Sequence, residues 1–378
     1  MKILTITNYY PPHFIGGYEI ACKETMDFLK ARGHEVVVVT SNYSKSQNKE
    51  DNVLRKMHLT DYSKTSKIQK KTDEYKNYKI VSDAITMIKP DLVYIWSLRG
   101  LGLYLIEAVE EQNIPKVFEI GDFWMYGYMQ KESKLKQIIK SFLPCFNTKE
   151  VKITPSICVS DWVAKEMQEV YRSDTTYTYP NATLIPNKKV YKNNTDIRFI
   201  FAGRIEEEKG LDLAIDALNR FALIHPESPF SFDIYGSGDE AYIDKCKALA
   251  RPIASKVNFR GKVQSKEKIY ANASILLMPT RMREPFGLVI IEAMAYRCAV
   301  IATNLYGPSE IIDHGKNGLL FDIQIPNDLL IQIEKLYFNA EYLNRIQENA
   351  YEHASQNYSI VKVKTKVEKL LQNIAGVA

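Results

Sequence analysis

The 378-residue sequence has few cysteines and no long apolar run. Its five cysteines are an odd number and include neither a Cys-x-x-Cys pair nor a histidine at zinc-ligand spacing, so a disulfide framework and a structural metal site are not expected. Charged residues interrupt the apolar stretches well before the roughly 18 residues that a membrane-spanning helix needs. We therefore predict reduced, mostly buried thiols and no membrane span.

The apolar run near the N-terminus does not predict a secretion signal, and the sequence has no dense basic stripe. The apolar run at 3–7 meets Pro11 before it could form the roughly 7 to 15 residue core of a signal peptide, so we predict a strand there and a cytoplasmic protein. A net charge of +5 is too small to indicate a nucleic-acid partner. The basic excess is local, with ten Lys or Arg against five acids in 44–80, which we predict to be a surface loop with some helix.

The remaining pattern is that of two α/β domains. A hydrophobic content of 46% indicates a folded globule, and the length exceeds the roughly 100 to 200 residues of one domain. Short, continuous apolar runs alternate with helical patterns, which predicts parallel sheets covered by helices on both faces. The expected strands are 3–7, 36–40, 92–95, 117–120 and 152–155, then 197–202, 230–235, 257–259, 274–278, 299–303 and 319–321. We predict two doubly wound parallel-sheet domains.

A polar stretch without apolar periodicity separates the two halves. We predict a first domain over 1–185, a linker over 186–196 and a second domain over 197–357. The apolar spacing in 358–378 predicts a closing helix that packs back on the first domain.

Ligands bind beyond the carboxyl ends of parallel strands, so the loops that follow strands are the candidate sites. Gly16 and Gly17 precede a helix and would let a phosphate approach backbone N–H groups, although a simple turn is the alternative. Arg204 and Lys209 lie in the loop after 197–202, and their charges suit a diphosphate. The alternative for these two cations is pairing with the acids at 206–208 on a solvated surface.

A third loop contains Gly236-Ser-Gly238 and formally satisfies the G-x-G-x-x-A dinucleotide pattern. The strand after it ends in Arg260-Gly-Lys262 and not in the acid that a ribose needs, which favours a general nucleotide-side turn.

The fourth loop is the most specific, because it places two carboxylates near a helix start. Glu284 lies in the loop, and Glu292 lies one to two turns into a helix that begins near Phe286. Two carboxylates at this spacing can accept hydrogen bonds from two sets of hydroxyls, while the N–H groups at Phe286, Gly287 and Leu288 point at an anion between them. Glu292 has apolar neighbours on most faces, so we expect it to have a polar partner.

Together these motifs resemble the retaining, nucleotide-sugar-dependent glycosyltransferases of family 4. The motifs are Glu284-x7-Glu292 with Pro285-Phe-Gly-Leu, Gly203-Arg204-x4-Lys209-Gly210, Gly16-Gly17-x-Glu19 and Glu310-Ile-Ile-x-x-Gly315-x-x-Gly318-Leu. The resemblance spans nearly the whole chain. It implies the GT-B arrangement, in which two Rossmann-like domains face a central cleft, the first binding the acceptor and the second the nucleotide sugar.

The resemblance also implies roles for single residues. Arg204 and Lys209 would neutralise the departing diphosphate, and Glu284 would lie near the donor sugar. Glu292 would bind the ribose hydroxyls. The other implied donor-binding positions are Gly16, Gly17, Gly203, Gly236, Gly261, Lys262, Val263, Phe286, Gly287 and Leu288.

The implied donor is a UDP- or GDP-sugar as co-substrate, and the implied acceptor is a carbohydrate, a lipid-linked molecule or a small molecule, in polysaccharide, glycolipid or other glycoconjugate synthesis. We expect no cofactor and no metal, because the sequence has no Asp-x-Asp and the cations and a helix terminus take the part of a divalent ion. A nucleotide-sugar epimerase, an oxidoreductase that uses Gly236-Ser-Gly238 and a non-catalytic binding subunit are the alternatives.

One position departs from the family pattern. Members commonly carry a histidine before Asp-x-Trp at the end of a first-domain strand, whereas here Gly121 precedes Asp122 and Trp124. We expect Asp122 to act on the donor sugar or the acceptor hydroxyl as a general base, with Gly121 leaving space for a larger acceptor or a water. The alternative is that Asp122 caps the following turn.

A second basic segment suggests a membrane surface as partner. Its residues are Lys131, Lys134, Lys136 and Lys140 around Leu135, Ile138, Ile139, Phe142 and Leu143. A helix of this kind can lie in an interface, so with 44–80 it predicts peripheral contact with anionic lipid on the inner face. An acceptor-domain helix with solvated lysines is the alternative.

Overall fold

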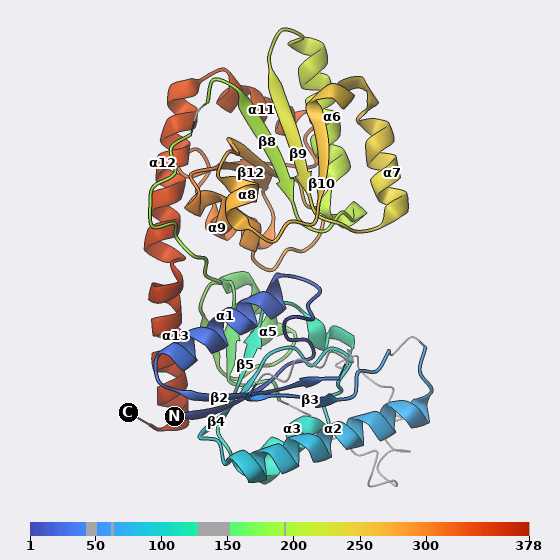
Figure 1. Ribbon diagram of the computed structural model, residues 1–378, viewed down its shortest axis with the longest axis vertical. Helices are drawn as coiled ribbons and strands as arrows, with labels where there is room; N and C mark the ends of the chain where they lie inside the picture. The colour runs from blue at the N-terminus through green and yellow to red at the C-terminus, as the bar shows by residue number, and fades with distance from the viewer. Residues whose placement is uncertain (43–50, 62–63, 128–151, 193, 378) are drawn as a thin grey trace. The chain divides into compact units, whose positions relative to one another are not determined.

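The computed structural model describes residues 1–42, 51–61, 64–127, 152–192 and 194–377. The chain forms two compact units (Figure 1). Unit 1 comprises Met1–Tyr179 and Lys364–Ala378, and unit 2 comprises Pro180–Val363. Each unit contains one parallel sheet with helices on both faces, which confirms the α/β class and the doubly wound architecture. The chain changes unit after Tyr179, so the predicted linker 186–196 lies inside unit 2.

Unit 1 is built on a sheet of seven strands, all parallel. Their order is β3 (Val53–Met57), β2 (Glu35–Ser41), β1 (Lys2–Ile6), β4 (Leu92–Ile95), β5 (Lys116–Ile120), β6 (Ser156–Cys158) and β7 (Thr176–Thr178). Strand β1 is central, because Ile3 pairs with Val36 of β2 on one side and with Leu92 of β4 on the other. The connections include α1 (Gly17–Ala31), α2 (Lys67–Ile88), α3 (Leu105–Glu111), η1 (Trp124–Gly127) and α5 (Asp161–Glu169).

The two faces of this sheet are covered by different helices (Figure 1). Helix α1 and the final helix α13 (Ile360–Ala375) share one face, where Met26 of α1 and Leu371 of α13 belong to the same core as Tyr94 and Trp96. Helices α2 and α3 cover the other face. Because both faces are packed, the valines of β2 are all buried, as a continuous apolar run predicts.

Unit 2 has a sheet of six parallel strands. Their order is β10 (Val257–Gly261), β9 (Phe230–Tyr235), β8 (Ile197–Ala202), β11 (Ile275–Met278), β12 (Ala299–Thr303) and β13 (Leu319–Phe321). Helices α6 (Leu211–Ile224), α7 (Glu240–Leu249) and α11 (Asp328–Tyr337) pack with Phe199, Phe201 and Leu277 in one core. Helix α9 (Leu288–Ala295) packs on β11 and β12. The remaining helices are η3 (Glu207–Lys209), η4 (Arg251–Lys256), α8 (Lys266–Tyr270), α10 (Tyr306–Ile311) and α12 (Ala340–Asn357).

Two expectations about secondary structure were wrong. The strand predicted over 152–155 instead occupies Ser156–Cys158, because Pro155 has no N–H to donate to a ladder and only its carbonyl, which accepts from the N–H of Phe118, bonds to β5. The basic segment 44–80, predicted as a loop with some helix, holds strand β3 and more than half of the 22-residue helix α2 in its described part. The basic helix predicted around 131–143 lies outside the described residues.

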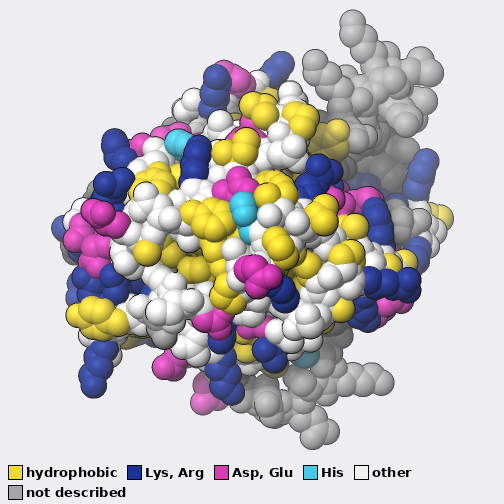
Figure 2. Space-filling view, turned by 90° about the horizontal axis from the view of Figure 1, so that it is seen from above, with side chains coloured by type: hydrophobic (Ala, Val, Ile, Leu, Met, Phe, Trp, Pro, Cys, Tyr) yellow, Lys and Arg dark blue, Asp and Glu magenta, His cyan; other side chains and the backbone are white. Residues whose placement is uncertain are grey.

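Surface charge, thiols and helix composition bear on three expectations from the sequence: no nucleic-acid partner, no disulfide framework and no membrane span. Figure 2 shows one face of the molecule, on which Lys and Arg alternate with Asp and Glu around apolar side chains, so this face has no field of one sign. Cys22, Cys158, Cys246 and Cys298 are buried free thiols, and Cys145 lies outside the described residues. Within the described ranges, no helix is both long and apolar enough to cross a bilayer.

Candidate functional site

The carboxyl edge of the unit 2 sheet brings two predicted residues together. Strands β8 and β11 are neighbours, and Lys209 and Glu284 lie in the loops that follow them. The Lys209 Nζ atom is 2.5 Å from Glu284 Oε2, and the two side chains are only 18% and 14% exposed. The structure thus places an ammonium and a carboxylate, distant in sequence, at one point of the edge. A surface hollow beside this pair is lined by Glu207, Glu208, Arg281, Met282 and Arg283.

Arg204 pairs with one of the acids at 206–208 on an exposed surface, which was the alternative to a diphosphate site. Its Nη1 atom is 2.7 Å from Glu206 Oε1, and the Arg204 side chain is 46% exposed. An exposed ion pair contributes only about 0 to 1 kcal/mol to stability. Arg204 can therefore exchange Glu206 for another anion at little cost.

Glu292 has two polar partners, as expected for a carboxylate with apolar residues on most sides. The hydroxyl of Tyr270 donates to Glu292 Oε2 at 3.0 Å, and Lys266 Nζ lies 3.0 Å from Oε1. Burial, followed by the nearby Glu292 charge, raises the pKa of Tyr270 well above its usual range, so the phenol remains a donor. Sequence reasoning missed Lys266 and Tyr270, although their four-residue spacing on α8 puts them on one helix face.

The start of helix α9 supplies backbone donors next to Glu284. The helix begins at Leu288, two residues after the predicted start, and its first N–H groups have no acceptor within the helix. Gly287 has a φ of +107°, a backbone conformation that strains any residue with a Cβ atom, so glycine is favoured there. Phe286 is buried beneath this turn.

Three predicted glycines meet at the ends of adjacent strands β8, β9 and β10. The N–H of Gly236 donates to the carbonyl of Gly261 at 2.9 Å, and a Cβ atom at 236 would lie 1.8 Å from the carbonyl oxygen of Gly203. Close backbone approach therefore accounts for Gly236, whereas Gly203 and Gly261 have open space at the Cβ position and are favoured by their positive φ angles of +153° and +68°. Lys262 and Val263 follow directly after β10.

The turn after β9 is not arranged for a dinucleotide. A Cβ atom at Gly238 would lie 2.1 Å from the carbonyl oxygen of Ile205, so this glycine also serves backbone contact. The Asp239 carboxylate caps α7 by accepting from the N–H of Tyr242 at 2.7 Å. A carboxylate already occupies the helix terminus where a pyrophosphate would bind, which weighs against the oxidoreductase alternative.

In unit 1, Gly16 and Gly17 lie at the start of α1 as predicted. Gly16 is the N-cap residue, and its N–H donates to Glu19 Oε2 at 2.9 Å. Burial raises the pKa of the Glu19 carboxyl, while backbone hydrogen bonds oppose the shift. The helix start is therefore closed by its own acid, and a phosphate there stays a prediction.

The predicted open space beside Gly121 is wrong. A Cβ atom at 121 would lie 2.3 Å from Cε2 of Tyr18, whose hydroxyl donates to the carbonyl of Glu119 at 2.5 Å. The ring of Tyr18 also packs 5.3 Å from the ring of Trp96. The region next to Gly121 is thus filled by an aromatic ring from α1.

Asp122 has two partners. Its Oδ1 atom accepts from the N–H of Trp124 at 3.1 Å, so it caps the start of η1, the alternative given above. Its Oδ2 atom accepts from Arg99 Nη2 at 2.8 Å, and both side chains remain partly exposed. The cap and the ion pair leave the carboxylate accessible to solvent.

Across the described part of the chain, no group of three or more His, Cys, Asp or Glu side chains is arranged to hold a metal ion. The charges at the unit 2 edge belong to Lys, Arg and single carboxylates.

The comparisons with known proteins cover both units. The family model described as Glycosyltransferase Family 4 matches residues 15–183, and the model described as Glycosyl transferases group 1 matches residues 186–353. An uncharacterized glycosyltransferase of Methanocaldococcus jannaschii is 26% identical over 380 residues, covering 99% of both chains.

Two solved structures share the fold. Sucrose-phosphate synthase of Thermosynechococcus elongatus has a TM-score of 0.77 at 17% identity, covering 99% of this chain and 98% of its own. HepE of Anabaena, in complex with UDP and glucose, has a TM-score of 0.74 at 20% identity, covering 99% of this chain and 100% of its own.

Proposed function

This chain belongs to glycosyltransferase family 4 and has the GT-B fold, and on that premise we propose that it transfers a sugar from a nucleoside diphosphate to an acceptor hydroxyl with retention at the anomeric carbon. The observation that carries the proposal is the contact between Lys209 and Glu284 at the carboxyl edge of unit 2. This edge is where ligands of open parallel sheets bind.

Lys209 and Arg204 would act on the leaving diphosphate. The ammonium of Lys209 has three donors, so it can keep Glu284 and still bind a phosphate oxygen. Arg204 would leave its exposed partner Glu206 for the second phosphate, where a guanidinium fork gains two hydrogen bonds. Fixed cations lower the barrier because negative charge grows on the diphosphate as the sugar leaves.

The donor sugar and ribose would bind on either side of this diphosphate. Glu284 would accept hydrogen bonds from the sugar, with the first N–H groups of α9 beside it. Glu292, held by Tyr270, would bind the ribose hydroxyls. We propose UDP or GDP as the nucleotide, and the solved complex of HepE with UDP supports the first.

The acceptor step is assigned to unit 1. Asp122 would take the proton of the acceptor hydroxyl while the hydroxyl attacks from the face that the diphosphate leaves. Arg99 would orient the carboxylate, since it already holds one of its oxygens. The acceptor is a carbohydrate, a lipid-linked molecule or a small molecule of glycoconjugate synthesis.

Peripheral membrane contact forms part of the proposal. On α2, Ile68 is 82% exposed and lies between Lys67 and Lys70. An exposed apolar side chain flanked by cations suits an anionic lipid surface. Sedimentation with vesicles should depend on anionic lipid and on salt, and independence of both would contradict it.

The proposal is tested by incubation with nucleotide sugars and candidate acceptors. We expect release of the nucleoside diphosphate and a product with the anomeric configuration of the donor, seen by proton NMR. Activity should survive a chelator, since Lys209, Arg204 and the α9 terminus replace a metal. An inverted product contradicts retention, and complete loss that added metal reverses contradicts metal independence. A changed sugar without acceptor would indicate an epimerase.

A further inference from the structure

We infer that Arg281 and Asp212 form a clamp that positions Lys209 and Glu284 for the diphosphate, an inference that rests on the proposed function. Neither residue belongs to the motifs from which the site was predicted. Arg281 lies three residues before Glu284, and Asp212 lies in the first turn of α6, three residues after Lys209. The clamp therefore links the loop that carries Lys209 to the loop that carries Glu284 through residues other than these two.

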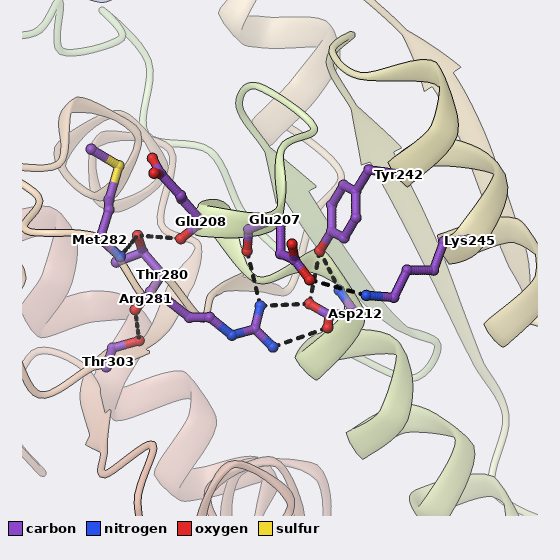
Figure 3. Close-up of polar contacts among 9 residues, drawn as sticks. All are labelled: Glu207, Glu208, Asp212, Tyr242, Lys245, Thr280, Arg281, Met282 and Thr303. Atoms are coloured by element: carbon purple, nitrogen blue, oxygen red, sulfur yellow. Dashed lines mark hydrogen bonds and ion pairs between the residues drawn. The ribbon is translucent and has the colours of Figure 1, made fainter.

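The guanidinium of Arg281 binds three acceptors, one in the loop after β8 and two in the first turn of α6. Its Nη1 and Nη2 atoms donate to the two Asp212 oxygens at 2.7 and 2.9 Å, which is a two-point fork. Nη1 also donates to the carbonyl of Glu207 at 2.9 Å. Figure 3 shows the fork and the carboxylate facing each other between the two loops.

Two backbone N–H groups and one hydroxyl in the loop of Arg281 donate to a single carbonyl. The N–H of Arg281 donates to the Glu208 carbonyl at 2.8 Å, and the N–H of Met282 and the hydroxyl of Thr280 donate to it at 3.3 and 3.2 Å (Figure 3). Glu208 immediately precedes Lys209. The position of the Lys209 backbone is thus set by the loop that carries Glu284.

Asp212 is itself held in place by a third element. The hydroxyl of Tyr242 from α7 donates to Asp212 Oδ1 at 2.7 Å and accepts from the Asp212 N–H at 3.2 Å. Asp212 is 16% exposed in its side chain. Although burial opposes it, the hydrogen bonds from Arg281 and Tyr242 hold the pKa of Asp212 below its usual value, so the carboxylate stays charged at neutral pH.

This arrangement is more than a surface ion pair. The Asp216 and Arg220 pair lies one turn further along α6, with both side chains about half exposed and within one helix. It joins no loops. The Arg281 fork joins two loops that carry the reacting charges, and a misplacement of about 1 Å in such a site can cost about 100-fold in rate.

The first test is independent of any ligand. In the free protein, Arg281→Gln should speed amide hydrogen exchange at least about tenfold in both 203–210 and 279–287, because the loops lose their shared donor. Asp216→Asn is the matched control and should leave both segments unchanged. Unchanged exchange in Arg281→Gln would overturn the clamp. Arg281→Lys is the milder variant for the case of misfolding, and it should also speed exchange, since one ammonium cannot form the fork.

The second test asks whether the clamp acts through Lys209. We expect Arg281→Gln to weaken binding of UDP or GDP about tenfold in the parent, and less than about twofold in a Lys209→Met background, because coupled residues are not additive. The same factor in both backgrounds would overturn positioning through Lys209. If the parent binds none of the nucleoside diphosphates while the exchange result holds, the proposed function fails and the joining of the two loops is retained.

Discussion

The two units carry the same kind of parallel sheet but place their ionisable side chains differently. In unit 2 the charges lie at the carboxyl edge, as the pairs of Lys209 with Glu284 and Lys266 with Glu292. In the described part of unit 1 the rings of Tyr18 and Trp96 pack at this edge. An acid lies inside the core, where Glu119 of β5 accepts from the hydroxyl of Tyr94 at 2.5 Å. The described residues of the two edges thus differ, since ion pairs predominate in unit 2 and aromatic rings fill part of the edge in unit 1.

The difference shows that topology locates a site and side chains decide its chemistry. Both edges lie beyond strand ends, but among the described residues the edge of unit 2 gathers more cations and carboxylates, next to the N-terminus of α9. Unit 1 offers Asp122 with Arg99 as its accessible charged pair next to β4 and β5. This contrast supports our proposal that the nucleotide binds to unit 2 and that unit 1 takes the proton-transfer role.

The largest expected effect is on turnover in unit 2. Lys209→Met should lower turnover at saturating donor by about 100 to 1000-fold, because a fixed charge on the leaving diphosphate is lost. Turnover should fall far more than stability, which is measured by the unfolding midpoint. Lys247→Met, which removes an exposed partner of Asp244, is the control and should behave as the parent. Near-parental rates for Lys209→Met would rule out its role.

Asp122→Asn probes the corresponding edge of unit 1. The amide oxygen keeps the cap on the Trp124 N–H, while the charge is removed. We expect transfer to fall by about 100-fold with unchanged nucleotide binding, the range usual for an acid-base group. A folded variant that transfers sugar at the parental rate would leave Asp122 as a cap only.

Gly121→Ala tests whether the ring of Tyr18 fills the space next to Gly121. The added methyl group would meet the ring of Tyr18, so unfolding free energy should fall by about 1 to 3 kcal/mol, as overpacking usually costs. In a Tyr18→Ala background, Gly121→Ala should leave the unfolding free energy unchanged, because the ring that the methyl group would meet is absent. Equal cost of Gly121→Ala in both backgrounds would contradict the packing, and chemical denaturation measures it.

An effect on stability of similar size concerns pH. Burial raises the pKa of Glu119 to about 7, while nearby Lys364 and the Tyr94 hydrogen bond oppose the shift. The folded state therefore holds the proton more tightly than the unfolded state, and stability should fall as pH rises from about 4.5 to 7. Glu119→Gln should flatten this dependence by about 1 to 3 kcal/mol. The exposed Glu35→Gln is the control, and a slope that persists in Glu119→Gln would contradict the assignment.

The sequence predicted the sheets well and the polar contacts less well. Continuous apolar runs located β4, β8, β9, β12 and β13 at their observed bounds, because burial on both faces leaves a clear signal. Strand β3 was missed because it is a partly exposed edge strand that contains Arg55 and Lys56.

For the candidate site, too, the sequence predicted which residues take part better than it predicted their contacts. Motif spacing identified Lys209 and Glu284, but not which charge each would meet, since a contact between residues 75 positions apart depends on tertiary packing. The ring beside Gly121 could not be anticipated, because Tyr18 reaches it from another element.

The central claim, that unit 2 binds the nucleoside diphosphate at its carboxyl edge, is tested most directly by hydrogen exchange with and without UDP or GDP. We predict protection of 203–210 and 279–292 at a ligand concentration that saturates the parent, and little protection in Lys209→Met at the same concentration. Protection confined to the loops after β1, β4 and β5, or equal protection in parent and variant, would contradict the account.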